Sequence, residues 1–200
     1  MLEFAGAYCV FANEGYRVKT HFIKKIEDSK GNVLYKADET KNKVLDKSLT
    51  FILNNMLTAT YDSAFIDYNY PTAISLASKL THKYSLKSGT TDTDNWYMGY
   101  NKDILVSTWV GYDNNRTLAP SVYKYGQNIW YKTIENYEQD KPDSWYEIPE
   151  NVSGVIVDPI SGKPATEASP KKKLMYFIKG TEPKETDTVF DDKLENTHPT

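Results

Sequence analysis

The stretch Lys-Ser-Gly-Thr-Thr at residues 87–91 comes at the end of one predicted strand and directly before two more. Residues 82–86 have a strand pattern, and Asn95–Tyr100 and Asp103–Tyr112 follow after short connections. The stretch therefore belongs to a sheet, near the end of one strand. The rest of the chain is organised around that position.

The residue types in this stretch suit the binding of a peptide that ends in a carboxylate. Lys87 is a cation, Ser88 and Thr90 carry hydroxyl groups, and a glycine between them, Gly89, lets a ligand approach the backbone. On a regular strand Lys87, Gly89 and Thr91 share one face, and the two hydroxyl residues share the other. An edge strand also offers unpaired N–H and C=O groups to an extended peptide. The same triplet also ends strands with a purely structural role, so its context has to decide.

Bulk composition favours a globular chain without a nucleic-acid function. The 200 residues suit one domain, or one domain with an appendage, and 40% hydrophobic residues are enough for a core. The 24 basic and 27 acidic residues give a net charge of −3, which argues against general nucleic-acid binding. The run Lys171–Lys173 is typical of a solvated face or a turn.

The sequence contains no pattern for a metal or a cofactor. Cys9 is a lone cysteine in an apolar helical stretch and is expected in the core, and His21, His82 and His198 are scattered. We find no phosphate loop, dinucleotide fingerprint or apolar run long enough to span a membrane. The chain starts in a helix with no leader, as a fragment of a longer protein would.

Several further elements are predicted from apolar periodicity and turn residues. The first two are a helix over residues 4–12, with Phe4, Tyr8 and Phe11 on one face and a left-handed cap at Gly15, and a hairpin of residues 21–27 and 33–35. A helix capped by Asp46 or Ser48 follows, and its apolar stripe is expected to be a core face: Leu49, Ile52, Leu53, Met56 and Leu57. The last are a short helix from Pro71 with Ala73, Leu76, Ala77 and Leu80 apolar, a helix over residues 122–137 with Val122, Tyr125, Ile129, Trp130, Ile134 and Tyr137 apolar, and strands at 154–157 and 174–178.

The composition divides the chain into three parts. Residues 1–142 form the main portion, residues 143–180 form an extension rich in Pro, Ser and Gly, and residues 181–200 form a polar tail that we expect to be mobile.

Five segments, taken in order, resemble one known family. They are Phe4–Gly15 with its Ala-Tyr…Phe-Ala-Asn-Glu-Gly pattern, His21–Tyr35, Lys87–Thr91, the strand pair Asp94–Tyr100 and Val106–Asp113, and Tyr176–Pro183. Together they are similar to the C-terminal part of a class A, bifunctional penicillin-binding protein transpeptidase domain. The triplet by itself is a weak signal, whereas the ordered set covers nearly the whole chain.

The sequence departs from the family pattern at the nucleophile. In the family, Ser-x-x-Lys and Ser-x-Asn precede the Lys-[Ser/Thr]-Gly strand. This chain has no Ser-x-Asn, and its Ser-x-x-Lys at Ser169–Lys172 follows the triplet in a segment rich in Pro and Lys, as a chance match would. Residues 61–82 are long and aromatic in place of the usual Gly- and Thr-rich approach, which would give the groove a different shape.

The resemblance implies a role for each matching residue in peptidoglycan cross-linking, where a serine attacks a D-Ala-D-Ala stem peptide and forms an acyl-enzyme. Lys87 and Thr90 would be catalytic: Lys87 supplies positive charge, and the Thr90 N–H forms half of the oxyanion hole. The hydroxyl groups of Ser88 and Thr90 would hold the carboxylate of substrate or β-lactam. Gly89 would let the ligand lie against the strand, and Thr91 would neighbour the site.

The resemblance also implies an architecture and partners. The fold would be α+β, with an antiparallel sheet covered by helices and shared by the hairpin strands and residues 82–112. The partners would be stem peptides, β-lactams and the missing N-terminal part of the transpeptidase domain, with no cofactor. The parent enzyme would be anchored at the outer face of a bacterial cytoplasmic membrane. Trp96 and Trp109 are expected to pack the sheet.

Two other interpretations stay open. The chain could be a non-catalytic module that binds cell-wall peptide or a protein along an exposed strand. It could also be a relative of serine β-lactamases, although the strands at residues 94–113 and the C-terminal extension resemble the synthetic enzymes. Without its nucleophile, the 200-residue chain is predicted to be inactive by itself.

Overall fold

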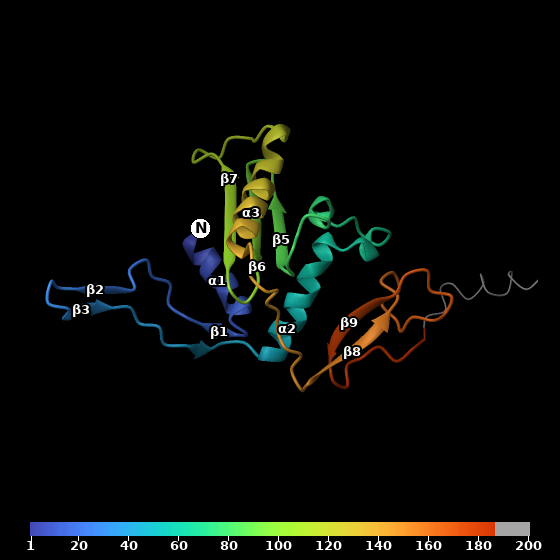
Figure 1. Ribbon diagram of the computed structural model, residues 1–200. Helices are drawn as coiled ribbons and strands as arrows, with labels where there is room; N and C mark the ends of the chain where they lie inside the picture. Colours follow the sequence, from blue (N-terminus) through green and yellow to red (C-terminus); the bar gives the residue numbers. More distant parts are fainter. Residues whose placement is uncertain (187–200) are drawn as a thin grey trace, which may run out of the picture.

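The structure, a computed structural model, describes residues 1–186 and has an α+β fold, as expected (Figure 1). The helices are α1 (Leu2–Ala12), α2 (Lys47–Met56) and α3 (Tyr123–Glu138), with short 3₁₀ turns η1 (Leu57–Tyr61), η2 (Ser63–Phe65), η3 (Ile74–Leu76) and η4 (Pro120–Val122). The strands are β1 (Tyr16–Arg17), β2 (Lys25–Glu27), β3 (Val33–Lys36), β4 (Asn42–Lys43), β5 (Ser85–Thr90), β6 (Asp94–Tyr100), β7 (Leu105–Gly111), β8 (Val152–Val157) and β9 (Lys173–Ile178).

An antiparallel sheet of β5, β6 and β7 forms the centre of the molecule (Figure 1). Its two faces carry different helices. Trp130 of α3 lies against Gly99 on one face, and its ring would be 2.3 Å from a Cβ at that position. On the other face the Trp96 ring lies 5.4 Å from Phe4 of α1. Because odd and even residues of a strand point to opposite faces, α3 and α1 enclose the sheet between them.

The core lies between α3 and the sheet. Trp130 and Ile134 are fully buried there with Tyr84 and Leu86, and the Trp130 and Tyr84 rings meet edge to face at 5.7 Å. The Trp130 Nε1–H donates to the Gly99 carbonyl oxygen at 3.4 Å. The predicted apolar face of this helix is only partly correct, because its other members Tyr125, Ile129 and Tyr137 are exposed in the structure.

Helix α1 ends as the sequence predicts. Gly15 has a φ of +94°, its N–H bonds to the Val10 carbonyl, and a Cβ there would meet the Leu45 carbonyl oxygen at 2.3 Å. Phe4 is exposed, whereas Tyr8 and Phe11 are half-buried by aromatic contacts along the helix and with β6. Of the aromatic face predicted for this helix, only Phe4 is therefore exposed.

The stripe on α2 is a core face only in part, which corrects the sequence-based expectation: Ile52, Leu53 and Leu57 are half-buried, and Ile52 packs against the apolar cluster of Phe51. Leu49 and Met56 are 55% and 56% exposed, while the buried residues are Ser48, Thr50, Phe51 and Asn54. The polar face is buried because it is hydrogen-bonded: the Asn54 amide donates to the Phe11 carbonyl oxygen at 3.1 Å. Asp46 caps the helix as predicted, accepting from the Ser48 N–H.

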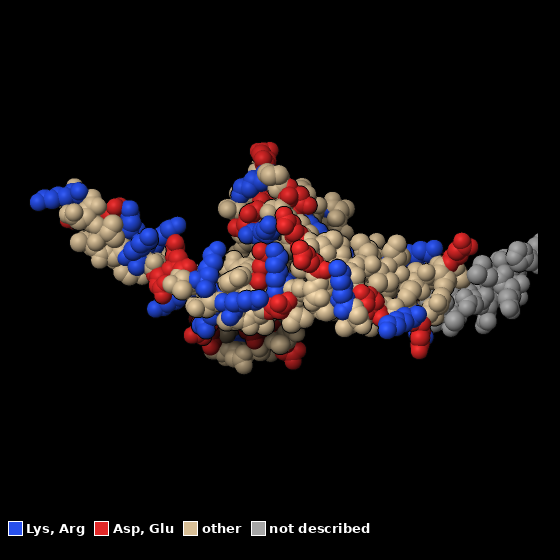
Figure 2. Space-filling model, turned by 90° about the horizontal axis from the view of Figure 1, so that it is seen from below, with Lys and Arg blue, Asp and Glu red and all other residues tan. Residues whose placement is uncertain are grey.

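Two other elements also differ from expectation. The helix expected from Pro71 is reduced to the single turn η3, although Ala73 and Leu76 are buried as expected. The β2–β3 hairpin does not join the central sheet. It projects as a separate arm, on which lysines gather (Figure 2), and its Phe22 is 88% exposed.

Strands β8 and β9 pair with each other and pack against α2. The contact is an apolar cluster of Phe51, Tyr146 and Val152 with Tyr176, whose ring lies 5.0 Å from that of Phe51. We refer to residues 152–178 as the C-terminal module. Of the polar tail expected at residues 181–200, the structure describes 181–186, where Glu182 accepts a hydrogen bond from Ser153, and residues 187–200 lie outside the described part.

The start of β6 is fixed by an acidic side chain. The Asp94 carboxylate accepts hydrogen bonds from Thr93 Oγ1 and from Trp109 Nε1, each at 2.7 Å. These bonds, with that of Thr93 the larger contribution, lower the pKa of Asp94 below its ordinary value. Trp109 thus packs the sheet as expected, with its indole N–H bonded.

A Gly99→Ala substitution should destabilise the fold by about 1–3 kcal/mol, because its Cβ would overlap the Trp130 ring, which is fully buried. The matched control is Gly89→Ala on the neighbouring strand, where the nearest atom to the new Cβ is Trp96 Cβ at 3.7 Å. Urea unfolding of the two variants and the wild type measures the difference. Equal stability of the two variants would contradict the packing described here.

An Asp94→Asn substitution should reduce stability at neutral pH and have less effect in acid. Because the folded-state pKa of Asp94 is lowered, the carboxylate stabilises the fold fully above the ordinary carboxyl pKa of about 4. That stability is lost as the pH falls through the folded-state pKa. Urea unfolding at pH 7 and at steps down to pH 3 should show the two proteins converging, and a constant difference would refute the role of the charge.

Candidate functional site

Strand β5, which carries the Lys-Ser-Gly-Thr stretch, lies at the edge of the sheet. The Thr91 N–H donates to the Asp94 carbonyl oxygen at 2.9 Å, so these two residues form a hydrogen-bonded pair. In an antiparallel ladder such pairs alternate with pairs whose polar groups point away from the partner strand. The Thr90–Asn95 and Ser88–Tyr97 pairs are therefore of the second kind. Their alternation directs the N–H groups of Ser88 and Thr90 to the outer edge.

No other strand in residues 1–186 pairs with this outer edge of β5. The Lys87 ammonium lies over it and donates to the Ser88 carbonyl oxygen. The edge thus combines a cation with outward-directed backbone N–H groups, which is the equipment for holding an anionic, extended ligand.

A hollow of about 430 Å³ adjoins the strand on the α1 side. Apolar side chains of α1 and β6 form most of its wall; the lining residues are Met1, Phe4, Tyr8, Lys87, Ser88, Gly89, Trp96 and Met98. Trp96 therefore has two contacts, packing against Phe4 as expected and also facing the hollow. Gly89 leaves the floor open, because the nearest atom to a Cβ there would be 3.7 Å away. The hollow can take an apolar group beside the Lys87 cation.

The hydroxyl groups of the stretch lie on the other face, as the alternation predicts. Ser88 is 9% exposed, and its Oγ donates to Thr72 Oγ1 at 2.8 Å. Thr90 is exposed, and its Oγ1 accepts from the Asn95 amide at 3.1 Å. The structure therefore brings Lys87 and Gly89 together on one face. The hydroxyl groups of Ser88 and Thr90 lie on the opposite face, and the two faces meet only at the outer edge of β5.

Thr91 closes the turn between β5 and β6. Its Oγ1 accepts from the backbone N–H groups of Thr93 and Asp94, at 3.2 and 3.0 Å. The side chain of Thr91 thus fixes the end of β5.

Tyr61 is a positioning residue that the sequence analysis missed. Its hydroxyl donates to the Tyr84 carbonyl oxygen at 2.7 Å and accepts from the Tyr84 N–H at 3.1 Å. It thereby occupies the outer edge just before β5, where a neighbouring strand would otherwise pair. Burial raises the pKa of Tyr61 to about 12, so it stays protonated over the physiological range. The only sequence signal was a tyrosine in an aromatic loop, which does not identify its partner.

The Ser-x-x-Lys matches lie away from the Lys87 hollow. Ser169 is buried in the loop of the C-terminal module, where its Oγ accepts from the Thr166 N–H at 3.0 Å. A second Ser-x-x-Lys match, Ser121–Lys124, was overlooked in the sequence and lies at the junction of η4 and α3. That junction belongs to the α3 side of the sheet, and neither match lines the hollow beside Lys87.

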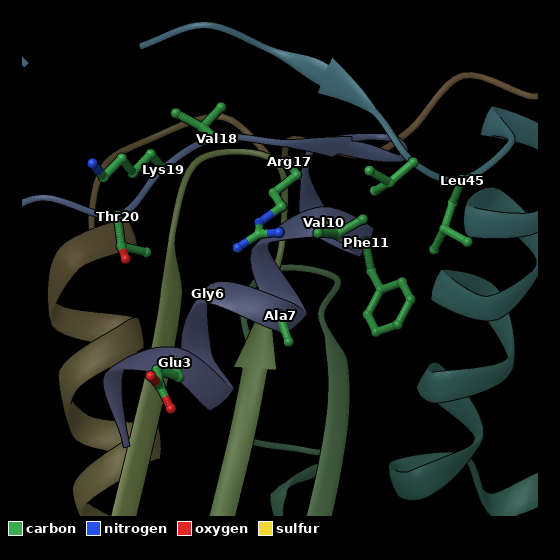
Figure 3. A pocket seen from close by; sticks show the side chains of 11 residues that line it. Glu3, Gly6, Ala7, Val10, Phe11, Arg17, Val18, Lys19, Thr20 and Leu45 are labelled. Carbon is green, nitrogen blue, oxygen red and sulfur yellow. The ribbon is translucent and has the colours of Figure 1, made fainter. Parts of the chain in front are cut away.

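A second hollow, of about 520 Å³, lies between α1 and the segment after it (Figure 3). Arg17 extends over α1 beside Val10, and Gly6 and Ala7 form the helix wall. This hollow includes no residue of the Lys-Ser-Gly-Thr stretch.

Comparison with known proteins gives consistent matches along the chain. The family described as "Penicillin binding protein transpeptidase domain" matches residues 1–147, and "Penicillin-binding protein 1A, C-terminal domain" matches residues 148–192. Penicillin-binding protein 2D of Bacillus subtilis is 34% identical over 183 residues, which is 91% of this chain and 26% of that protein. Penicillin-binding protein 1A of Aquifex aeolicus is 32% identical over 189 residues, 91% of this chain and 24% of the relative.

Solved structures give the same result. The crystal structure of penicillin-binding protein 1A from Haemophilus influenzae superposes with a TM-score of 0.78 at 27% identity, covering 93% of this chain and 33% of that one. The D,D-transpeptidase domain of a peptidoglycan glycosyltransferase from Eggerthella lenta, at 17% identity and a TM-score of 0.51, shares the fold.

The chain spans about a quarter of the length of these two curated relatives. Within residues 1–186, no helix combines the length and the apolar character that a membrane crossing requires. The family expected from the ordered sequence segments is confirmed. The chain belongs to the penicillin-binding protein transpeptidase family, and its last part matches the C-terminal domain of penicillin-binding protein 1A.

Proposed function

We propose that this chain forms one wall of the active site of a peptidoglycan DD-transpeptidase, which cross-links D-Ala-D-Ala stem peptides through an acyl-serine. The observation that carries the proposal is the outer edge of β5. There the Lys87 ammonium, the unobstructed backbone at Gly89 and the outward N–H of Thr90 lie together along one unpaired strand edge. An extended peptide ending in a carboxylate, or a β-lactam that mimics it, fits such an edge.

Each residue has a distinct task in this proposal. Lys87 supplies positive charge beside the attacking serine, and Gly89 lets the peptide lie flat on the strand. The Thr90 N–H donates to the developing oxyanion, where one such donor contributes about 10²–10³-fold to the rate. The exposed Thr90 hydroxyl holds the ligand carboxylate, and the Ser88 hydroxyl joins it by exchanging its hydrogen bond to Thr72 for one to the ligand. Thr91 keeps the strand end in place.

The nucleophile comes from outside these 200 residues. Covalent catalysis requires a serine with an adjacent base at the reacting carbonyl. Ser121 lies on the α3 side of the sheet, and Ser169 is buried in the C-terminal module. The chain by itself therefore supplies half of an oxyanion hole and forms no acyl-enzyme. In the parent protein, anchored at the outer face of a bacterial cytoplasmic membrane, an upstream part of the transpeptidase domain completes the site.

The exposed stripe of α2 is the surface on which that upstream part packs. Leu49 and Met56 are more than half exposed, although they belong to the most regular apolar stripe in the sequence. Two such residues on one helical face are unfavourable in water and stable when covered.

A second function is supported by the same open edge of β5. An unpaired strand can bind an extended peptide without any chemistry, as a non-catalytic module for cell-wall peptide or a protein partner. The test compares this chain with a longer protein that also includes the sequence upstream of residue 1, called the upstream-extended protein. The two functions differ in whether that protein forms a covalent adduct with a β-lactam.

Fluorescent penicillin should label the upstream-extended protein and leave the 200-residue chain unlabelled, with intact mass reporting the adduct. In the extended protein Lys87→Ala should slow acylation by about 10²–10⁴-fold, because a positioned charge and proton-transfer group is lost. The control is Lys102→Ala, an exposed lysine in the β6–β7 connection. Labelling of the short chain would refute the missing nucleophile, and labelling of neither form would favour the binding module.

Replacing Leu49 and Met56 together by Lys should affect the two forms in opposite directions. In the 200-residue chain it should reduce self-association, because exposed apolar surface is removed. In the extended protein it should destabilise the domain by about 2–5 kcal/mol, because charges replace covered apolar groups. Light scattering and thermal unfolding measure the two effects. Unchanged stability of the extended protein would show that nothing covers α2.

A further inference from the structure

We propose that the C-terminal module positions the active-site strand β5 by holding residues 57–72 through two lysine–aspartate pairs. This proposal rests on the proposed function, because the strand matters only if it forms a wall of the site. It assigns a role to the run Lys171–Lys173, which has no role in the proposed function.

The lysine run alternates between paired and exposed side chains. Lys171 Nζ lies 2.6 Å from Asp67 Oδ2, and Lys173 pairs with Asp62. Lys172, between them, is exposed. Lys173 is the first residue of β9 and Lys171 lies in the loop just before it, so two of the three lysines contact residues 57–72.

Asp62 receives contacts from both sides. Its Oδ1 caps the turn η2 by accepting from the Ala64 N–H at 2.9 Å, while its Oδ2 receives Lys173. The side chain of Asp62 is 19% exposed and that of Lys173 is 33% exposed, so the pair is largely shielded from solvent. Such shielding makes a pair less sensitive to screening than a surface pair.

The module itself is attached firmly to the domain. Phe51 of α2 lies in an apolar cluster with Tyr146, Val152 and Tyr176. The pair to Asp62 is therefore made by the first residue of a strand whose own position is fixed by α2, and the pair to Asp67 by the residue two positions before that strand. A fixed strand can restrain a loop, whereas a mobile one would only move with it.

The restrained segment ends on β5 at two points. At one end Tyr61 makes both hydrogen bonds to Tyr84, directly before the strand. At the other end Thr72 accepts from Ser88, the middle residue of the Lys-Ser-Gly triplet. The two ends are held to each other by the Ala73 N–H, which donates to the Thr60 carbonyl oxygen at 2.8 Å.

A further contact holds the residue directly before Tyr84. Lys83 Nζ donates to Asn55 Oδ1 at 3.1 Å and lies 4.3 Å from the centre of the Trp145 ring. Burial lowers the pKa of Lys83, and the nearby charge of Lys173 lowers it further. Lys83 is thus held by α2 and by Trp145, which precedes the C-terminal module in the chain.

These contacts form a continuous path from the module to the triplet. Loss of both pairs frees residues 62–67 and loosens Tyr61 and Thr72, which align the edge of β5. Misalignment of an oxyanion donor slows chemistry more than it weakens the fold. The module therefore acts on acylation through position, without touching the ligand.

The test uses the upstream-extended protein with Lys171 and Lys173 both replaced by Met, and Lys172→Met as the matched control. The double variant should be acylated by penicillin about 3- to 30-fold more slowly, and the control at the wild-type rate. Hydrogen exchange should rise in residues 57–72 and 84–90 and stay unchanged in β6 and β7. Reversing the pair whose aspartate caps no turn, as Asp67→Lys with Lys171→Asp, should recover part of the rate lost by Lys171→Met.

The outcomes separate the two proposals. Wild-type acylation by the double variant would overturn the positioning role. A loss of acylation accompanied by faster exchange throughout the sheet would also overturn it, because the module would then only stabilise the fold. If the extended wild-type protein itself forms no penicillin adduct, the proposed function fails first.

Discussion

The antiparallel pairing of β5 with β6 is the constraint on which the candidate site depends. Once Thr91 bonds to Asp94, the alternation of the ladder determines which N–H groups face outward, and those of Ser88 and Thr90 do. The same register puts Lys87 beside the apolar wall that α1 and β6 provide. Side-chain chemistry at this edge is therefore a consequence of backbone pairing.

Three surfaces of the described chain are left uncovered. They are the exposed residues of the α2 stripe, the projecting β2–β3 arm and the unpaired edge of β5. Exposed apolar surface and unpaired strand edges promote association with other surfaces. The chain spans about a quarter of its curated relatives, and an upstream part of the domain is the proposed cover for α2. The open edge of β5, in contrast, is where the proposed ligand lies.

Much of the local structure was predictable, because local signals determine it. The left-handed conformation at Gly15, the Asp46 cap and the strands β5, β6 and β7 follow from residue types within a few positions of each other. The site strand was found in the same way. The face of α2 was predicted only in part, with Leu49 and Met56 exposed, because apolar periodicity identifies a stripe but not whether the covering surface belongs to the same chain.

The sequence by itself determined the family, the element types and the position of the Lys-Ser-Gly-Thr stretch, because ordered motifs and local periodicity carry that information. Only the tertiary structure decided which groups contact that stretch. Thr72 contacts Ser88 of the stretch, and Tyr61 contacts Tyr84 shortly before it. The lysines of the C-terminal module contact Asp62 and Asp67, which lie between Tyr61 and Thr72 in the chain. Such contacts depend on how the chain closes its loops, and residue types at distant positions do not reveal their partners before it folds.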